Sequence, residues 1–126
     1  MALWQTGFGG RTAYGQGFPV HDAYHYSTTR ILADGADLLV WISSFNEART
    51  PPATAVPTVV LGREGMSFER EPAVFIPVGT PGLDHTGHLF RTDRVVALPL
   101  HRLRESALPS VAEAIAAIEA ALQEAP

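Results

Sequence analysis

The 126-residue chain contains no cysteine. This absence excludes disulfide bonds, a cysteine-ligated zinc, an iron–sulfur cluster held by this chain and any thiol nucleophile. Whatever chemistry the chain takes part in must therefore rely on other side chains or on other proteins.

Lysine is also absent, and nine arginines carry all of the positive side-chain charge in a chain of net charge −4. They are spread along the chain without a basic run, so nucleic acid is not an expected partner. No apolar run approaches the ~20 residues that a membrane-spanning helix needs. The first seven residues lack the basic and apolar regions of a secretory signal, so we expect a cytoplasmic protein without a membrane partner.

The length and the 46% hydrophobic content predict a single α/β domain over residues 1–126. Glycines and Pro19 make residues 7–20 a glycine-rich loop. Helical spacing predicts a helix over 23–34, capped by Asp22 and ended by Gly35. The remaining predicted elements are four extended segments and a C-terminal amphipathic helix, at 38–42, 58–61, 73–78, 94–100 and 111–124.

The C-terminal helix has the clearest signals. Ser110 and Glu113 form a capping-box pair, and an apolar stripe follows. We expect this stripe to pack inward. Its members are Val111, Ile115, Ile118 and Leu122.

The apolar runs at 38–42 and 73–78 do not alternate with polar residues, which is typical of strands buried on both faces of a parallel sheet. Pro77 indicates an edge strand or a break. The connections look too short to cover both faces, so we expect a partner protein in a hetero-oligomer. Aromatic residues in the glycine-rich segment are the interface candidates: Phe8, Tyr14 and Phe18.

Motifs for catalysis are incomplete, and no catalytic residue is nominated. The G-x-G-x-x-G spacing fails because Thr12 takes the place of the third glycine. Ser43 and Ser44 follow a strand, but the G-x-S-x-G elbow is missing.

A predicted loop holds the polar candidates. His85 and His88 lie three residues apart beside Asp84 and are candidate metal ligands, although no third firm ligand is present and hydrogen-bonded or solvated histidines are the plainer interpretation. The candidates for cofactor contact are Asp84, His85, Arg91 and Asp93.

Several segments, in order, resemble the B subunits of formylmethanofuran dehydrogenases. They are Thr6-Gly7-Phe8, Gly17-Phe18-Pro19, Tyr26-Ser27 with Arg30-Ile31-Leu32, Gly35 to Ser43, Ala73 to Gly79, and Gly82 to Asp93 followed by Val95-Val96. The resemblance implies a Rossmann-like or flavodoxin-like, mostly parallel sheet from the C-terminal region of a molybdopterin oxidoreductase. In that family the redox ligands lie in a part of the subunit that has no counterpart in this cysteine-free chain.

The resemblance extends to the formyltransferase/hydrolase complex of methylotrophs, which works in tetrahydromethanopterin- and methanofuran-linked formaldehyde oxidation without a redox step. It implies a non-catalytic structural subunit with amidohydrolase-like and formyltransferase subunits as partners, and no cofactor in this chain. One alternative is a domain of a tungsten or molybdenum enzyme whose 82–93 loop approaches molybdopterin. Another is a free-standing flavodoxin-like domain that binds a small molecule.

Overall fold

A computed structural model describes residues 12–13, 15, 17–18, 20–90 and 96–124. The chain divides into two compact units, Met1–Leu39 and Val40–Pro126. The single domain expected over residues 1–126 stays a prediction. In the described residues, no helix is both long and apolar enough to cross a membrane.

The first unit pairs two short strands where the sequence predicts a glycine-rich loop. Strand β1 (Thr12–Ala13) runs antiparallel to β2 (Val20–His21). The chain then turns at Asp22, whose carboxylate accepts hydrogen bonds from the backbone N–H groups of Tyr24 and His25 at 2.9 and 2.8 Å. The backbone and ring hydrogen bonds of His25, followed by the Tyr24 N–H, lower the pKa of Asp22 to about 2.

The helix predicted over 23–34 is shorter than expected. Helical backbone occupies α2 (Thr28–Arg30) and the π-helical segment η1 (Ile31–Gly35). Asp22 caps a turn rather than a helix, and Gly35 is the last residue of η1 rather than a residue beyond it. A side chain that satisfies nearby N–H groups stabilises a local turn in competition with a continuous helix.

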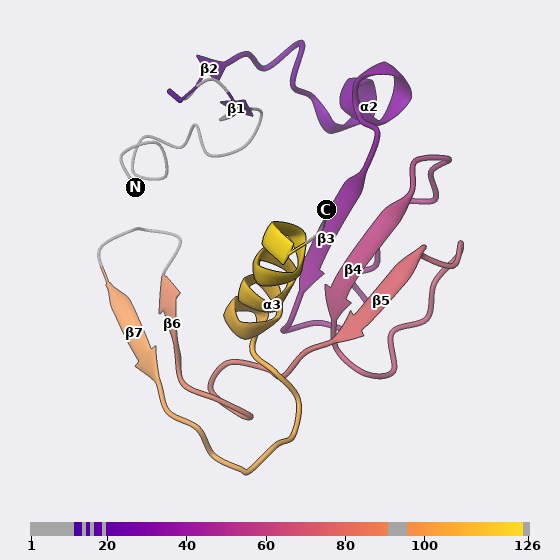
Figure 1. The fold of residues 1–126 in the computed structure, drawn as a ribbon. Coiled ribbons are helices and arrows are strands. Elements are labelled where there is room, and N and C mark those ends of the chain that lie inside the picture. The colour runs from indigo at the N-terminus through magenta and orange to yellow at the C-terminus, as the bar shows by residue number, and fades with distance from the viewer. Residues whose placement is uncertain (1–11, 14, 16, 19, 91–95, 125–126) are drawn as a thin grey trace. The chain divides into compact units, whose positions relative to one another are not determined.

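The second unit is built on a three-stranded sheet in the order β3–β4–β5, with bounds Leu39–Ser43, Thr58–Gly62 and Val74–Pro77. The three arrows point the same way (Figure 1), and the β4–β5 pair is parallel with Val59 opposite Val74. The predicted parallel sheet is confirmed. Pro77 ends β5 at an edge of the described sheet, as its missing N–H requires.

Two contacts distinguish the faces of the sheet. Trp41 Nε1 donates to the carbonyl oxygen of Arg49, 3.0 Å away in the β3–β4 connection. Phe75 stacks edge-on with Phe68 of the β4–β5 connection. Because successive strand residues point to opposite faces, Val40 and Val74 lie on the other face, away from these connections.

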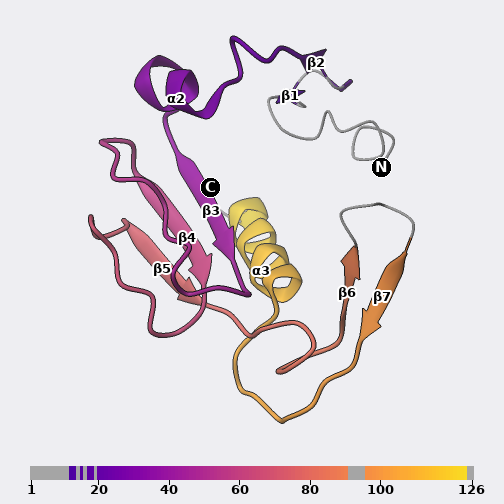
Figure 2. The same ribbon diagram turned by 180° about the vertical axis from the view of Figure 1, so that it is seen from behind.

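Helix α3 (Val111–Glu124) packs on that other face, as Figures 1 and 2 show from opposite sides. Its bounds match the prediction, and the capping box is formed: Glu113 N donates to Ser110 Oγ at 3.2 Å and Ser110 N to Glu113 Oε2 at 2.7 Å. The buried core beneath α3 consists of Leu61, Val78 and Ala114, with Val59, Ile76 and Val111 packed around it.

The predicted inward stripe of α3 is wrong in detail. Ala114 is the buried helix residue, while Ile115, Ile118 and Leu122 are 44%, 37% and 71% exposed. The helix is rotated so that the Val111–Ala114 side meets the sheet, because a small side chain allows close approach to Leu61 and Val78.

The expectation that the apolar strands are buried on both faces is met by only one of the three strands described in this sheet. Strand β4 is buried along most of its length, while residues of β3 and β5 stay exposed on the helix face. A central strand has neighbours on both sides, and an edge strand needs a further layer that the described residues do not supply.

The segment after β5 forms a turn and then a hairpin. Strand β6 (Gly87–Phe90) pairs antiparallel with β7 (Ala97–Leu100). Gly82 has φ +79, and a Cβ there would lie 3.1 Å from Leu100 Cβ, so the turn requires glycine. The 94–100 prediction therefore holds for its second half, while residues 91–95 lie outside the described part.

Candidate functional site

The carboxyl ends of the parallel strands are the first place to look for a site, because ligands of open α/β sheets bind there. Ser44 follows β3, Gly62 ends β4, and Thr80 follows β5. Thr80 Oγ1 donates to the Ser44 carbonyl at 2.9 Å, and Val78 N donates to the Gly62 carbonyl at 2.8 Å. These bonds tie the three strand ends to one another.

Asp84 is the buried acid of this region, with a side chain 3% exposed. One carboxylate oxygen accepts the Thr80 N–H at 2.8 Å, and the other accepts Arg104 Nε at 2.6 Å. The Arg104 hydrogen bond, followed by the Thr80 N–H, lowers the pKa of Asp84. The carboxylate is therefore ionised, and both of its oxygens accept hydrogen bonds from its own chain.

His85, the neighbouring candidate, has both ring nitrogens engaged. Nε2 lies 3.0 Å from the Gly79 carbonyl oxygen and Nδ1 3.0 Å from the Thr86 carbonyl oxygen. A neutral imidazole carries one N–H, so one of these contacts is a hydrogen bond donated to a carbonyl, and the other ring nitrogen also faces a carbonyl oxygen of its own chain. Gly79 is required here, since a Cβ would lie 2.9 Å from Asp84 Cβ and 3.1 Å from the His85 ring.

His88 is exposed on β6, and the structure does not join it with Asp84 and His85 into a ligand set. Among the residues that the structure describes, no group of three possible metal ligands occurs. Arg91 and Asp93 lie outside the described residues, as do Phe8 and Tyr14, and Phe18 is 61% exposed.

The N-terminus of α3 lies beside this region, because Gly79 N donates to the Pro109 carbonyl at 2.9 Å. Hydrogen bonds from Ser110 lower the pKa of Glu113, so the carboxylate that a helix N-terminus attracts is supplied by the helix itself. The polar groups at the carboxyl ends of the strands therefore form hydrogen bonds with one another and hold the strand ends together.

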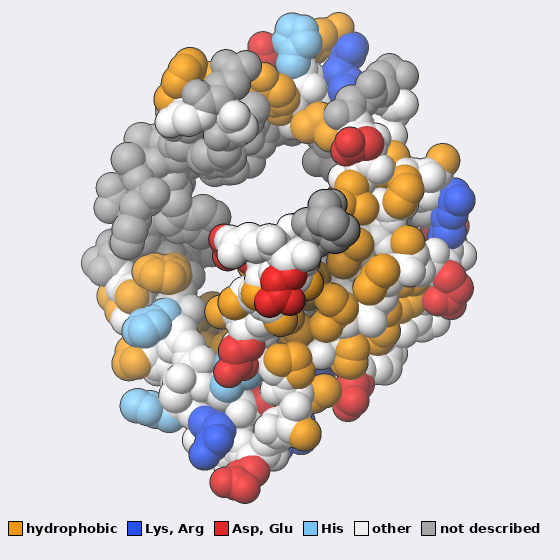
Figure 3. All heavy atoms as spheres, in the orientation of Figure 1, with side chains coloured by type: hydrophobic (Ala, Val, Ile, Leu, Met, Phe, Trp, Pro, Cys, Tyr) orange, Lys and Arg blue, Asp and Glu red, His pale blue; other side chains and the backbone are white. Residues whose placement is uncertain are grey.

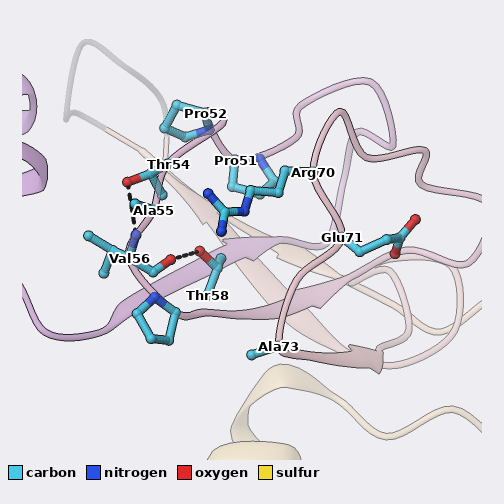
Figure 4. Close-up of a pocket in the computed structure, with 10 residues that line it drawn as sticks. Pro51, Pro52, Thr54, Ala55, Val56, Thr58, Arg70, Glu71 and Ala73 are labelled. Atoms are coloured by element: carbon cyan, nitrogen blue, oxygen red, sulfur yellow. Dashed lines mark hydrogen bonds between the residues drawn. The ribbon is translucent and has the colours of Figure 1, made fainter.

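A pocket of about 260 Å³ lies at the opposite end of the sheet. Three prolines line it, together with Thr58 and Arg70. In Figure 4 the Arg70 side chain points toward Thr58, while Glu71 points away. The buried Thr58 hydroxyl donates to the Val56 carbonyl at 3.1 Å. The proline-rich 51–57 connection lacks a catalytic motif, and the sequence offered no signal for a pocket there.

The second unit also carries exposed apolar side chains on one face. Hydrophobic side chains gather on the face that carries α3, over the helix and the sheet beside it (Figure 3). We call the exposed part of this face the open apolar surface, consisting of Val40, Ile42, Val74, Ile115, Ile118 and Leu122. Each of its six side chains is between 37% and 71% exposed. The sequence predicted an uncovered sheet but not which face stays open.

Fold and site together define a mixed α/β protein on a parallel sheet, with an internally bonded loop region and an open apolar surface. No family model matches the chain. It is similar to the B subunit of the formyltransferase/hydrolase complex Fhc of Methylorubrum extorquens strain AM1, with 29% identity over 99 residues, 76% of this chain and 27% of that protein.

A solved structure agrees with this similarity. The crystal structure of the formyltransferase/hydrolase complex FhcABCD from Methylorubrum extorquens with methylofuran contains a chain that matches 98% of this one. The TM-score is 0.74 and the identity 28%. The match covers 35% of that chain, so this chain spans about a third of its relative. The resemblance to the B-subunit family, and the α/β fold that it implied, are confirmed.

Proposed function

We propose that this chain is a non-catalytic structural component of a formyltransferase/hydrolase complex in one-carbon metabolism. The observation that carries the proposal is the match of 98% of the chain to one subunit of such a complex at TM-score 0.74. The corresponding pathway is formaldehyde oxidation linked to tetrahydromethanopterin and methanofuran. The corresponding location is the cytoplasm.

The internal bonding of the strand ends supports a structural role. Asp84 and His85, the candidates for cofactor contact that the structure describes, direct their polar atoms to Thr80, Arg104 and backbone carbonyls. A group that contacts substrate or cofactor needs a free donor, acceptor or lone pair aimed at the ligand. The absence of cysteine from the whole sequence removes the usual ligands of an iron–sulfur cluster.

The proposed partners are the amidohydrolase-like and formyltransferase subunits of the same assembly. The test is affinity purification of the tagged full chain from the cells that produce it naturally, followed by mass spectrometry and metal analysis. Stoichiometric co-purification of those two subunits, without tungsten or molybdenum, is the expected result. Stoichiometric tungsten or molybdenum in the complex would instead support a domain of a pterin-dependent dehydrogenase.

A deletion strain provides the functional test. Loss of the chain should lower the amount of assembled complex, and the remaining assembled fraction should keep its formyl hydrolysis rate per mole. A lowered rate per mole of intact complex would place this chain in the chemistry and contradict the structural role.

A further inference from the structure

The face of the sheet that carries α3 is covered beside the first turns of the helix and open along β3 and at the start of β5. Leu61, Val78 and Ala114 are at most 7% exposed. Val40 and Ile42 in β3 are 51% and 49% exposed, and Val74 in β5 is 47% exposed.

Helix α3 is covered at its start and exposed toward its end. It begins beside the carboxyl ends of the strands and runs back along the sheet, as both ribbon views show (Figures 1 and 2). Ala114 in its first turns is buried, whereas Leu122 in its last turns is 71% exposed. The later turns of α3, strand β3 and the start of β5 thus expose apolar side chains on one continuous face, an arrangement that monomeric proteins rarely leave in water.

Charge restricts what covers this surface. The exposed later turns of helix α3 carry Glu119 and Glu124 and no basic residue. A second copy of the chain would bring the same acidic helix to the interface, and like charges brought together oppose association. Basic side chains around an apolar stripe fit this surface instead. The layer that covers a parallel sheet is ordinarily helical.

The similar solved chain is part of a complex of several subunits, FhcABCD. We propose that the open apolar surface docks an amphipathic helix, flanked by arginine or lysine, from a partner subunit. This inference rests on the proposed function and names the surface and the kind of partner.

The test is site-specific photocross-linking of the tagged full chain in its natural host. A benzoylphenylalanine is placed at Leu122, which lies on the open apolar surface, or at Leu103, which lies in the loop after β7. The two leucines form a matched pair, because they are 71% and 76% exposed. The cross-linked peptides are identified by mass spectrometry.

The expected result is a cross-link from position 122, at least tenfold more abundant than from 103, to a partner peptide with a helical apolar stripe and basic flanks. A cross-link from 122 to a second copy, or to residues 1–39 of the same chain, would overturn the proposal. So would equal yields from the two positions.

Failure of this inference can be told apart from failure of the proposed function. If the chain co-purifies with the formyltransferase and amidohydrolase-like subunits but position 122 gives no cross-link, the complex stands and the docking surface is wrong. If 122 cross-links to a basic amphipathic helix of an unrelated assembly, the docking surface stands and the proposed function is wrong.

Charge substitutions give a second measurement. Leu122→Arg should reduce co-purification of the partner at least tenfold, because it places a cation against basic flanks, whereas Leu103→Arg should leave it unchanged. Circular dichroism of both variants checks folding, and arginine is a good helix former. Equal co-purification by the two folded variants would refute the inference.

Discussion

Substitution of Ile115 by alanine tests whether α3 is anchored by Ala114 rather than by its apolar stripe. Ile115 is 44% exposed, so about half of its side chain is already in water. Ile115→Ala removes three carbon groups. At ~0.8 kcal/mol for each buried group, the loss of unfolding free energy is about 2.4 kcal/mol for a fully buried side chain and about 1.3 kcal/mol at this exposure. Alanine also favours the helix by a few tenths of a kcal/mol, so the expected loss is about 1 kcal/mol.

Leu61→Ala is the matched comparison on the sheet side of the same contact. Leu61 is 0% exposed, and the cavity left in a closed core raises the expected loss to ~2–5 kcal/mol. Both variants of the full chain are measured by pulse proteolysis in urea, which works at low protein concentration. The wild-type chain sets the reference midpoint.

The two losses should differ by more than twofold in the isolated chain. Equal losses would show that Ile115 is as buried as Leu61 and that the described rotation of α3 is wrong. In the complex with its partner subunits the Ile115→Ala loss should grow, because a docked helix would cover the side chain and restore the full transfer and cavity contributions.

Three further predictions concern the strand ends and the absent redox chemistry. Gly79→Ala should lower the thermal midpoint of unfolding by several degrees, because the added Cβ would lie 2.9 Å from Asp84 Cβ. Gly15→Ala should leave the midpoint unchanged, because nothing lies within 4 Å of its Cβ. Equal midpoints for the two variants would contradict the described turn. The lowered pKa of Asp84 contributes stability that is fully present above its ordinary value of 3.8 and is lost as pH falls through the folded-state pKa. Acid titration of unfolding should therefore show a shallower decline below about pH 4 for Asp84→Asn than for the wild type, and parallel curves would refute the assignment. Finally, the purified chain mixed with molybdopterin should reduce no viologen dye with formate, and measurable dye reduction would contradict a non-catalytic chain.

Local signals predicted the elements whose ends depend on nearby residues. The Ser110–Glu113 capping box set the start of α3, and Pro77 marked the end of an edge strand. The helix predicted from residue 23 failed because Asp22 satisfies the N–H groups of its own turn, an alternative that apolar spacing does not reveal.

The candidate site shows the same division. The sequence placed Asp84 and His85 next to each other in a loop after a strand, which is where they lie. It did not show that Arg104, twenty residues away, takes the carboxylate, or that two backbone carbonyls take the imidazole. Those partners depend on the path of the chain rather than on residue type. Because of them, the candidate ligands form hydrogen bonds that hold the chain together.

The sequence by itself determined the absence of cysteine chemistry, the parallel α/β fold, the C-terminal helix and the resemblance to the B-subunit family. Only the tertiary structure decided which apolar residues are buried. Val60 in central β4 is 0% exposed and Val40 in edge strand β3 is 51% exposed, although both belong to apolar runs. The physical reason is that burial depends on the neighbours on each side of a strand and on the layer above it, which no run of residues specifies.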